Sequence, residues 1–288
     1  MASTQQLKSR IRSVKNTKQI TKAMQMVAAS KMRKAQEADK ASQAYTEAAN
    51  ELLTYLASQG VTKMHPLFAQ REVKSRLLVV IAADKGLAGA YNSNVMKLYV
   101  QTLRENDYNA QDHTIAIGRR AAQFVTRIKE TSVLGVYEDL PDHPSGNELN
   151  AIVDTVVEKF SSGEVDAVDV VYTKFVNSIV QVPAKLRVLP AGFKETEVSD
   201  EIREATYEPS IEAVLEGATY RLISAQIYQA LLDAKASEWS MRMMAMKNAT
   251  DNASDVIDDL TLEMNKARQA AITQELAEIS GGVEAMNA

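Results

Sequence analysis

The chain of 288 residues contains no cysteine. This absence excludes disulfide bonds, thiolate zinc sites and cysteine-based catalysis, and it is typical of proteins in a reducing compartment. Proline and glycine are scarce, with 6 and 11 copies, so few residues interrupt helices. No apolar run reaches the roughly 18 residues that a transmembrane helix needs. Hydrophobic residues still make up 45% of the chain, which excludes wholesale disorder.

Acidic residues are nearly absent from the start of the chain. Residues 1–40 contain ten basic and two acidic side chains, a net charge of +8, so the total of −4 leaves −12 for the rest. A basic, acid-poor start resembles a transit peptide. It lacks the apolar segment of a secretion signal, however, and its helical pattern continues without a break. We therefore expect it to belong to the mature structure.

The C-terminal part of the chain follows a heptad pattern. From residue 211 to residue 271 an apolar position recurs at alternating steps of four and three, and only Gln229 and Thr250 interrupt it. This spacing is typical of the a and d positions of a left-handed coiled coil. We call these positions the C-terminal seam: Ile211, Leu215, Ala218, Leu222, Ala225, Gln229, Leu232, Ala236, Trp239, Met243, Met246, Thr250, Ala253, Ile257, Leu260, Met264, Ala267 and Ala271.

Few helix breakers occur in this part of the chain. No proline follows Pro209, and Gly217 is the only glycine before Gly281. We therefore expect one helix from about Pro209 to Met286, roughly 115 Å long at 1.5 Å per residue. A helix of this length needs a partner along its seam.

A second long helix is expected over residues 3–57, with Ser3 as its N-cap and no proline or glycine before Gly60. Its many alanines allow a partner to approach closely. Its basic face leaves several interpretations open: a solvated face of a bundle, an acidic protein partner, a membrane surface or nucleic acid. Nucleic acid fits least, because the basic residues are not interleaved with aromatic ones. The apolar stripe comprises Leu7, Ile11, Val14, Ile20, Met24, Val27, Met32, Ala35, Leu52 and Leu56.

Between these helices the pattern alternates between strands and helices. Residues 76–83 form a continuous apolar run, typical of a strand buried on both faces of a parallel sheet. The alternation predicts a small doubly wound α/β domain, and Pro183 restricts the last strand to an edge of the sheet. The expected strands are 76–83, 113–117, 133–137, 168–175 and 178–189, and the expected helices are 91–103, 119–129 and from Ser145 or Asn147 to about Phe160.

The predicted fold class is therefore α/β, with a doubly wound α/β domain (residues 75–190) inserted into a long antiparallel two-helix coiled coil. An N-terminal helix (1–60) and a C-terminal helix (209–288) form the coiled coil. Because both helices leave the insertion near each other, they should run antiparallel, with facing residue numbers that sum to about 269. Ser3 would then lie beside about Lys266.

Residues after Ala267 would then have no partner in the chain. At this point the seam gives way to a new apolar stripe that is one residue out of phase, about 100° further around the helix. We expect this re-aimed stripe to bind another protein, and the alternative is a frayed tail. Its members are Ile272, Leu276, Ile279, Val283 and Met286.

We find no catalytic constellation, cofactor motif or metal-ligand set in the sequence. Residues 84–90 (DKGLAGA) follow the first strand, where a doubly wound fold places a phosphate-binding turn, but they match neither phosphate-binding glycine pattern. We expect a tight strand-to-helix turn there. His65, His113 and His143 are far apart and have no neighbours at metal-ligand spacing.

Two stretches resemble the γ subunit of F-type ATP synthase. Residues 16–35 (NTKQITKAMQMVAASKMRKA) resemble its N-terminal helix, and residues 265–282 (NKARQAAITQELAEISGG) resemble its C-terminal signature. Residues 244–253 (MAMKNATDNA) also fit. The order of long helix, α/β insertion and longer helix matches along the whole chain. The resemblance implies a rotor shaft with no catalytic residues, cofactor or metal of its own.

In that family the coiled coil lies inside a ring of three α and three β subunits, and the foot lies on the membrane-embedded c ring and binds the ε subunit. The resemblance thus implies that proton flow turns the shaft, which changes each β subunit in turn. It also implies a peripheral place at the cytoplasmic face of a bacterial plasma membrane. The plant-type redox insertion with two cysteines has no counterpart here, which favours a bacterial type and excludes thiol regulation.

The residues that match the family's contact motifs form three groups. The first combines polar contacts to a β-subunit loop with a tip held in an apolar sleeve: Arg268, Gln269 and Thr273, then Ile272, Leu276 and Ile279. The second matches the part of the N-terminal helix that faces the acidic lobe of the β subunits: Lys22, Met24, Met26 and Lys31. The third matches the foot that meets the c ring and ε: Tyr207 and Glu208.

Two other functions stay open on the residues alone. A nucleotide-binding α/β enzyme with coiled-coil arms would bind NAD or ATP through Lys85 and Gly86. A homodimeric coiled-coil scaffold or nucleic-acid clamp would pair its seam between two chains, from Leu232 to Leu260.

Overall fold

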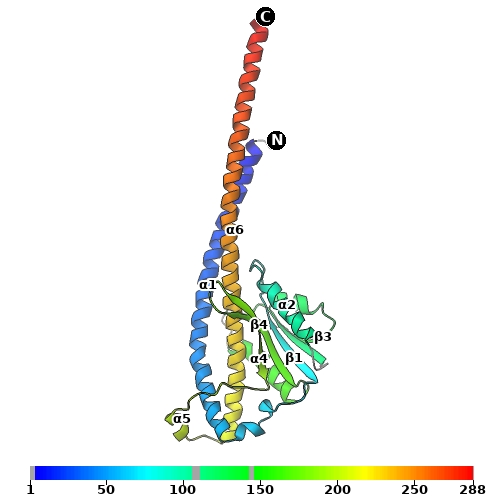
Figure 1. The fold of residues 1–288 in the computed structure, drawn as a ribbon, viewed down its shortest axis with the longest axis vertical. Helices are drawn as coiled ribbons and strands as arrows, with labels where there is room; N and C mark the ends of the chain where they lie inside the picture. Colours follow the sequence, from blue (N-terminus) through cyan, green and yellow to red (C-terminus); the bar gives the residue numbers. More distant parts are fainter. Residues whose placement is uncertain (1–3, 106–110, 143–145, 288) are drawn as a thin grey trace. The chain divides into compact units, whose positions relative to one another are not determined.

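The computed structural model describes residues 4–105, 111–142 and 146–287 (Figure 1). The chain divides into two compact units: the first comprises residues 1–28 and 243–288, and the second comprises residues 29–242. Helix α1 (Thr4–Ser58) and helix α6 (Ile211–Asn287) each contribute a segment to both units. Both predicted long helices are confirmed, with ends within two residues of those expected. Ser3, the predicted N-cap, lies outside the described residues.

The first unit is an antiparallel coiled coil of one α1 segment and one α6 segment. The hydroxyl oxygens of Thr21 and Thr250 lie 2.7 Å apart, which places these positions opposite each other. This pairing agrees with facing residue numbers that sum to about 269 in an antiparallel pair. The buried side chains of this unit are Leu7, Ile11, Thr21 and Ala28 on α1, and Met246, Thr250 and Ala253 on α6.

One part of the predicted apolar stripe on α1 is wrong. Ile20 and Val27 are 60% and 53% exposed, whereas Thr21 and Ala28 are buried in the seam. The buried heptad positions of α1 are occupied here by a threonine and an alanine. The prediction followed large apolar side chains and therefore selected the neighbouring, exposed positions. Threonine fits the seam because its hydroxyl bonds to Thr250, and alanine fits because it lets the two backbones approach closely.

The C-terminal seam on α6 is confirmed over most of its length. From Leu215 to Ala267 every seam position is buried or half-buried, including the polar interruptions Gln229 and Thr250. At the two ends, Ile211 is 36% exposed and Ala271 is exposed. The seam thus stays covered as far as antiparallel pairing predicts and no further.

The second unit contains a five-stranded sheet with strand order β3-β2-β1-β4-β5. Strands β1 to β4 pair in parallel, and β5 is antiparallel to β4. Pro183 lies on the edge strand β5, as predicted, where its missing N–H costs no essential ladder bond. The strands are β1 (Ser75–Ile81), β2 (Gln111–Ile117), β3 (Thr131–Tyr137), β4 (Ala167–Phe175) and β5 (Gln181–Leu189).

Helices cover both faces of this sheet, as the predicted doubly wound fold requires. α2 (Tyr91–Arg104) and α3 (Arg119–Val125) pack on one face, and α4 (Gly146–Ser161) packs on the other. α3 ends four residues before its predicted end. The reason is that β3 begins at Thr131, so the intervening residues must return the chain to the sheet.

The connecting segments contain three short helices that the sequence analysis did not predict. They are η1 (Val61–Met64), η2 (Pro66–Phe68) and α5 (Asp200–Glu204). Ser145, one of the two candidate caps of α4, lies outside the described residues. Within the described ranges, no helix is both long enough and apolar enough to span a bilayer.

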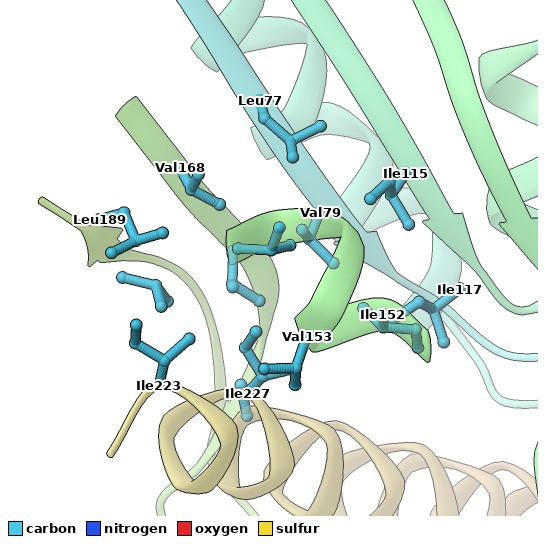
Figure 2. Packing of buried hydrophobic residues seen from close by; sticks show 14 of the residues in the cluster. Leu77, Val79, Ile115, Ile117, Ile152, Val153, Val168, Leu189, Ile223 and Ile227 are labelled. Atoms are coloured by element: carbon cyan, nitrogen blue, oxygen red, sulfur yellow. The ribbon is translucent and has the colours of Figure 1, made fainter. Parts of the chain in front are cut away.

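α6 also belongs to the core of the α/β domain. Ile223 and Ile227 are fully buried and pack with α4 and with sheet residues that include Val79 and Val168 (Figure 2). This stripe lies beside the seam, so α6 is apolar on two faces in the second unit. The sequence analysis did not predict this second face. The seam face packs instead on α1, in a cluster of Ala49, Leu53, Leu56, Leu215, Ala218 and Leu222.

Asp233 of α6 gives the second unit a pH dependence that can be tested. Burial raises the pKa of Asp233 to about 7 from 3.8, and the charge of Asp39 adds to the rise, while a backbone hydrogen bond from Phe175 and the charge of Lys174 oppose it. The folded chain thus keeps a proton that the unfolded chain loses. This stabilising contribution is complete below about pH 4 and is lost as the pH rises to about 7.

We therefore expect the Asp233→Asn variant to be more stable than the parent at about pH 8, with a difference that shrinks toward about pH 4. Urea unfolding of both proteins at the two pH values measures this. Asp251→Asn, at an exposed position on the same helix, is the control and should show no such trend. Equal stability of Asp233→Asn and the parent at the higher pH would contradict the expected titration.

Candidate functional site

The end of α6 has no partner within the described part of the chain, as predicted. All described side chains from Arg268 to Gly282 are exposed. Ile272, Leu276 and Ile279 are 50%, 59% and 64% exposed, so three large apolar side chains face solvent on one stripe of the helix. The side chains of the other two stripe members, Val283 and Met286, lie outside the described residues.

Polar side chains flank this exposed stripe on both sides. At about 100° per residue, Arg268 lies about 40° to one side of Ile272. Gln269 and Thr273 lie about 60° and 100° to the other side. The Thr273 hydroxyl donates to the backbone oxygen of Gln269 at 2.9 Å. The six residues of the first predicted group therefore share about 140° of the helix surface, which one partner surface can contact.

The second predicted group lies mostly on the α1 segment of the first unit. Lys22 and Met26 are exposed and Met24 is half-buried. The misassigned Ile20 and Val27 are exposed on the same segment. A groove of about 690 Å³ adjoins them, with three lysines among its lining residues: Lys15, Lys18 and Lys22. This surface is both basic and apolar, which is complementary to an acidic protein partner.

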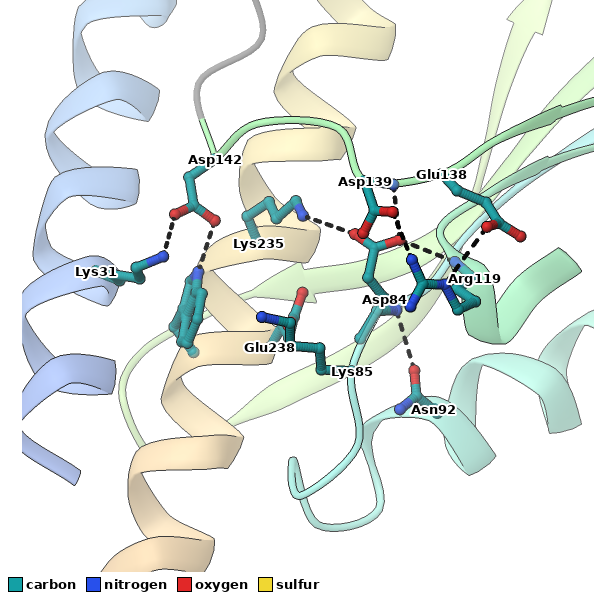
Figure 3. Close-up of polar contacts among 12 residues, drawn as sticks. Lys31, Asp84, Lys85, Asn92, Arg119, Glu138, Asp139, Asp142, Lys235 and Glu238 are labelled. Atoms are coloured by element: carbon teal, nitrogen blue, oxygen red, sulfur yellow. Dashed lines mark hydrogen bonds and ion pairs between the residues drawn. The ribbon is translucent and has the colours of Figure 1, made fainter. Parts of the chain in front are cut away.

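Lys31, the fourth member of that group, lies in the second unit and is engaged within the chain (Figure 3). Its Nζ is 2.7 Å from Asp142 Oδ2 and 4.6 Å from the centroid of the Trp239 ring. Trp239 Nε1 also donates to Asp142 Oδ1 at 3.3 Å. Burial raises the pKa of Asp142, but the hydrogen bond and charge of Lys31, the charge of Lys235 and the Trp239 hydrogen bond together hold the pKa below its usual value. Lys31 keeps 42% of its side chain exposed.

The third predicted group lies just before α6. The Tyr207 ring stacks on Tyr55 of α1 with centroids 5.6 Å apart, and its hydroxyl donates to the backbone oxygen of Ile202. Glu208 is exposed and lines a groove of about 380 Å³ together with residues of α1 and α6. Tyr207 is thus held on α1, while Glu208 is open to solvent.

A largely buried cluster joins residues 84–90 to α6, and Figure 3 shows its link between Lys235 and Asp84. We call it the clasp: Asp84, Lys85, Gly86, Lys235, Glu238, Trp239 and Arg242. The Arg242 guanidinium donates to Glu238 Oε1 at 2.7 Å and to the backbone oxygens of Lys85 and Gly86 at 3.3 and 3.1 Å. It also lies 4.5 Å from the centroid of the Trp239 ring. A second link is the 3.9 Å ion pair between Lys235 and Asp84.

The backbone amides near this turn are bound by the chain itself. Asp84 Oδ1 accepts from the backbone N–H of Arg119 at 3.0 Å and of Asp139 at 3.1 Å. In a doubly wound fold that binds a nucleotide, a phosphate takes such amides. Here a carboxylate takes them, and it would repel a phosphate. The prediction of a tight turn is confirmed, since Leu87 and Gly89 adopt positive φ values of 61° and 55°.

Sequence reasoning did not single out the three charged residues that α6 contributes to the clasp. Lys235, Glu238 and Arg242 are 8%, 5% and 4% exposed. They recur at steps of three and four, on one face of a helix whose neighbouring positions are largely apolar. A row of alternating charges in such surroundings signals buried ion pairs, because burial requires each charge to have a partner.

The histidines have separate surroundings. His65 Nδ1 accepts from the backbone N–H of Leu67 at 3.3 Å, and His113 Nδ1 lies 3.0 Å from the Ser132 hydroxyl. His143 lies outside the described residues. In the ranges that the structure covers, no three or more histidine, aspartate or glutamate side chains are grouped so that they could hold a metal ion.

Comparison with known sequences gives matches over the whole chain. A family model described as ATP synthase matches residues 3–286. The chain is 44% identical to the ATP synthase gamma chain of Pelotomaculum thermopropionicum, over 99% of this chain and 100% of that protein. It is 40% identical to the ATP synthase gamma chain of Staphylococcus saprophyticus, with the same coverage.

Solved structures with a similar fold come from two mitochondrial ATP synthases. The central stalk and c ring structure from Tetrahymena thermophila contains a chain with 26% identity and a TM-score of 0.54, covering 80% of this chain and 99% of that one. A structure from Euglena gracilis contains a chain with 19% identity and a TM-score of 0.66, covering 98% of this chain and 94% of that one. At 19% identity the second likeness supports the fold alone.

Proposed function

The chain belongs to the family of ATP synthase gamma chains, and from this premise we propose how its exposed surfaces meet the other subunits of the complex. As a gamma chain it is the central rotor shaft of an ATP synthase, a subunit of the complex with no catalytic site indicated of its own. In this proposal residues 1–60 and 209–288 form the shaft, and residues 75–190 form a domain at its foot.

The end of α6 is proposed to lie inside the catalytic ring of α and β subunits. The observation that carries this proposal is the change at Ala267: the seam is covered up to this residue, and every described side chain beyond it is exposed. Exposing three large apolar side chains on one stripe is costly in water, so a protein surface is expected to cover them. The polar contact to a β subunit is assigned to Arg268, Gln269 and Thr273.

The basic surface of α1 is proposed to face an acidic part of the β subunits. Lys22, Met24 and Met26 supply this contact, and the adjoining groove adds further lysines. Lys31 adds the exposed part of its side chain while it stays paired with Asp142. The charge complementarity would mainly set the orientation of the shaft, because exposed ion pairs contribute little net affinity.

Tyr207 and Glu208 are proposed to contact the c ring and the ε subunit. Support comes from the geometry of this connector, in which Tyr207 is stacked on Tyr55 and Glu208 is open to solvent. A foot at the c ring would place the protein peripherally, at the cytoplasmic face of a bacterial plasma membrane. Proton flow through the c ring would then turn the shaft.

The proposed mechanism needs no reactive group on this chain. A neighbour with several conformations changes its populations when it is contacted differently in each of them. A shaft whose proposed contact residues are confined to about 140° of α6 presents a different side to each of three β subunits as it turns. Packing of α6 on α1 along the seam supplies the stiffness that torque transmission requires.

The two rival functions are less well supported. A nucleotide-binding enzyme needs a phosphate-binding turn after β1, but the carboxylate of Asp84 lies there and would repel a phosphate, and Arg242 binds the carbonyl oxygens of Lys85 and Gly86. A homodimeric scaffold needs an open seam, but α1 of the same chain covers it. Co-purification with α and β subunits tests the rotor proposal directly: ATPase activity of the assembled ring should depend on this chain.

The polar contact at the end of α6 is tested by the variants Gln269→Leu and Thr273→Val in the reconstituted complex. Each should lower rotor-coupled ATP hydrolysis by about two- to tenfold, which corresponds to the loss of one hydrogen bond of about 0.5–1.5 kcal/mol. Gln274→Leu is the matched control, because residue 274 lies on the opposite side of the helix from Ile272 and Gln269. Normal turnover of a variant with both residues replaced would contradict the proposed contact.

A further inference from the structure

A second exposed groove lies on the α/β domain, between α2 (labelled in Figure 1) and α3. Its volume is about 870 Å³, and it is open to solvent along its length. The floor is apolar: Met96 and Val100 come from α2, and Phe124 comes from α3. The groove lies within residues 75–190, and it is not lined by any of the residues assigned above to contacts with the catalytic ring, the c ring or the ε subunit.

The walls of this groove carry unpaired positive charges. Lys97 and Arg104 lie on α2, Arg120 lies on α3, Arg127 lies in the turn that follows α3, and all four are exposed. None of them forms an ion pair with another described residue, whereas nearby Arg119 pairs with both Glu138 and Asp139. The groove has a single acidic lining residue, Glu105, which accepts a hydrogen bond from Gln101.

This accumulation of positive charge departs from the charge of its surroundings. The chain after residue 40 has a net charge of −12. Four unpaired cations around one groove therefore differ from the acidic average of this part of the chain. Four like charges at close range also repel one another, which disfavours the arrangement unless an anion neutralises it.

The positions of the cations define the shape of a ligand. Lys97 and Arg104 are seven residues apart on α2, so they lie on one face of that helix, while Arg120 on α3 and Arg127 just beyond its end line the groove from the side of α3. Cations therefore come from both sides of the groove, which Met96, Val100 and Phe124 also line. The complement of this surface is an elongated ligand with an apolar centre line and negative charge on both flanks.

We propose that the groove between α2 and α3 is a docking site for an acidic amphipathic helix of another protein. Such a helix places an apolar stripe on the floor and carboxylates against both walls, in the helix-in-groove mode of recognition. A small anion such as phosphate would satisfy the cations but would leave the apolar floor uncovered. The length of α2, 14 residues, matches about four turns of a bound helix.

The test uses the full chain and a synthetic helical peptide of about 15 residues. The peptide carries leucines at helical spacing and glutamates on both flanks, and its fluorescence anisotropy reports binding. Binding is expected, and it should weaken at least severalfold when the ionic strength rises from about 0.05 M to about 0.3 M. A peptide with lysine in place of glutamate should not bind. Absence of binding by the acidic peptide would overturn the proposal.

Substitutions test the charged walls and the apolar floor of the groove separately. Arg104→Glu combined with Arg127→Glu should weaken peptide binding by about tenfold or more, because attraction is replaced by repulsion on both walls. Val100→Ser should weaken binding through the floor. Lys129→Glu reverses an exposed charge that does not line the groove and should have no effect.

The same variants distinguish a helix site from a site for small anions. If tripolyphosphate displaces the peptide fully and Val100→Ser binds the peptide as the parent does, the groove recognises charge alone and the proposal fails. Unchanged binding by the double arginine variant would also overturn it. Because no residue assigned to a contact with the catalytic ring, the c ring or the ε subunit is altered, these outcomes leave the rotor assignment untouched.

Discussion

Replacing Arg242 with methionine is expected to lower the stability of the second unit by about 3–5 kcal/mol. Arg242 is 4% exposed and donates to the Glu238 carboxylate and to the backbone oxygens of Lys85 and Gly86. Methionine keeps the length and apolar stem of the side chain but none of its donors. Glu238, itself 5% exposed, would be left as a buried charge without its partner.

The single tryptophan of the chain is a fluorescent probe for this loss of stability, because it lies in the clasp. Trp239 lies against Arg242 in the clasp, so its fluorescence during urea unfolding reports the region that the variant disturbs. Combining Arg242→Met with Glu238→Gln should recover much of the loss, because no buried charge remains. Arg221→Met, an exposed arginine on the same helix, should change stability by less than about 0.5 kcal/mol. If the single Arg242→Met variant were as stable as the parent, the clasp would not contribute to the stability of the second unit.

The clasp has a mechanical consequence for a rotor. In the proposed arrangement, with the α/β domain at the foot, contacts between this domain and α6 carry part of the torque to the shaft. The apolar contacts of Ile223 and Ile227 provide one such connection, and the clasp provides a directional one, because its hydrogen bonds join particular atoms of residues 84–86 to α6. Arg242→Met should therefore lower coupled ATP hydrolysis in the reconstituted complex as well as stability.

Gly118→Ala is expected to destabilise the α/β domain by about 3 kcal/mol or more. Gly118 joins β2 to α3 with φ of +91°, a conformation that residues with a Cβ rarely adopt. A Cβ at this position would lie 2.1 Å from the backbone oxygen of Ala82 and 2.9 Å from its carbonyl carbon. Because these are backbone atoms at the end of β1, relief requires the sheet itself to move.

Thermal unfolding followed by circular dichroism measures this effect. Gly217→Ala is the control, because a Cβ at that position of α6 meets no atom within 4 Å and the residue is helical. It should raise stability by about 1 kcal/mol, since alanine has the higher helix propensity. Two glycine-to-alanine changes with opposite signs would show that local backbone geometry decides the outcome. A Gly118→Ala protein as stable as the parent would contradict the close approach to Ala82.

Most elements of the fold could be predicted because their signals are local. Heptad spacing places the seam of α6 on one face whatever lies opposite, and the run at residues 76–83 indicates a buried strand without knowledge of its neighbours. The exposed stripe beyond Ala267 was also predictable, since it needed only two helix lengths and an antiparallel pairing. The contacts of this stripe with other subunits stay a prediction.

The errors and omissions arise where a position is defined by a distant partner. Thr21 belongs to the seam of α1 because Thr250 meets it there, and the large apolar Ile20 beside it is exposed. The second apolar face of α6 was present in the sequence at Ile223 and Ile227. Its role could not be predicted from the sequence, because it depends on a part of the sheet face that α4 leaves uncovered.

The sequence by itself determined the two long helices, the α/β insertion, the extent of the covered seam and the family, because periodicity and motif spacing are properties of consecutive residues. Only the tertiary structure decided which residues of α1 enter the seam, that α6 completes the core of the α/β domain, and that Arg242 ties residues 85 and 86 to the shaft. These features depend on residues up to more than two hundred positions apart, such as Thr21 and Thr250. Their pairing follows from three-dimensional packing, and the spacing of residues within one helix does not show which distant residues they will meet.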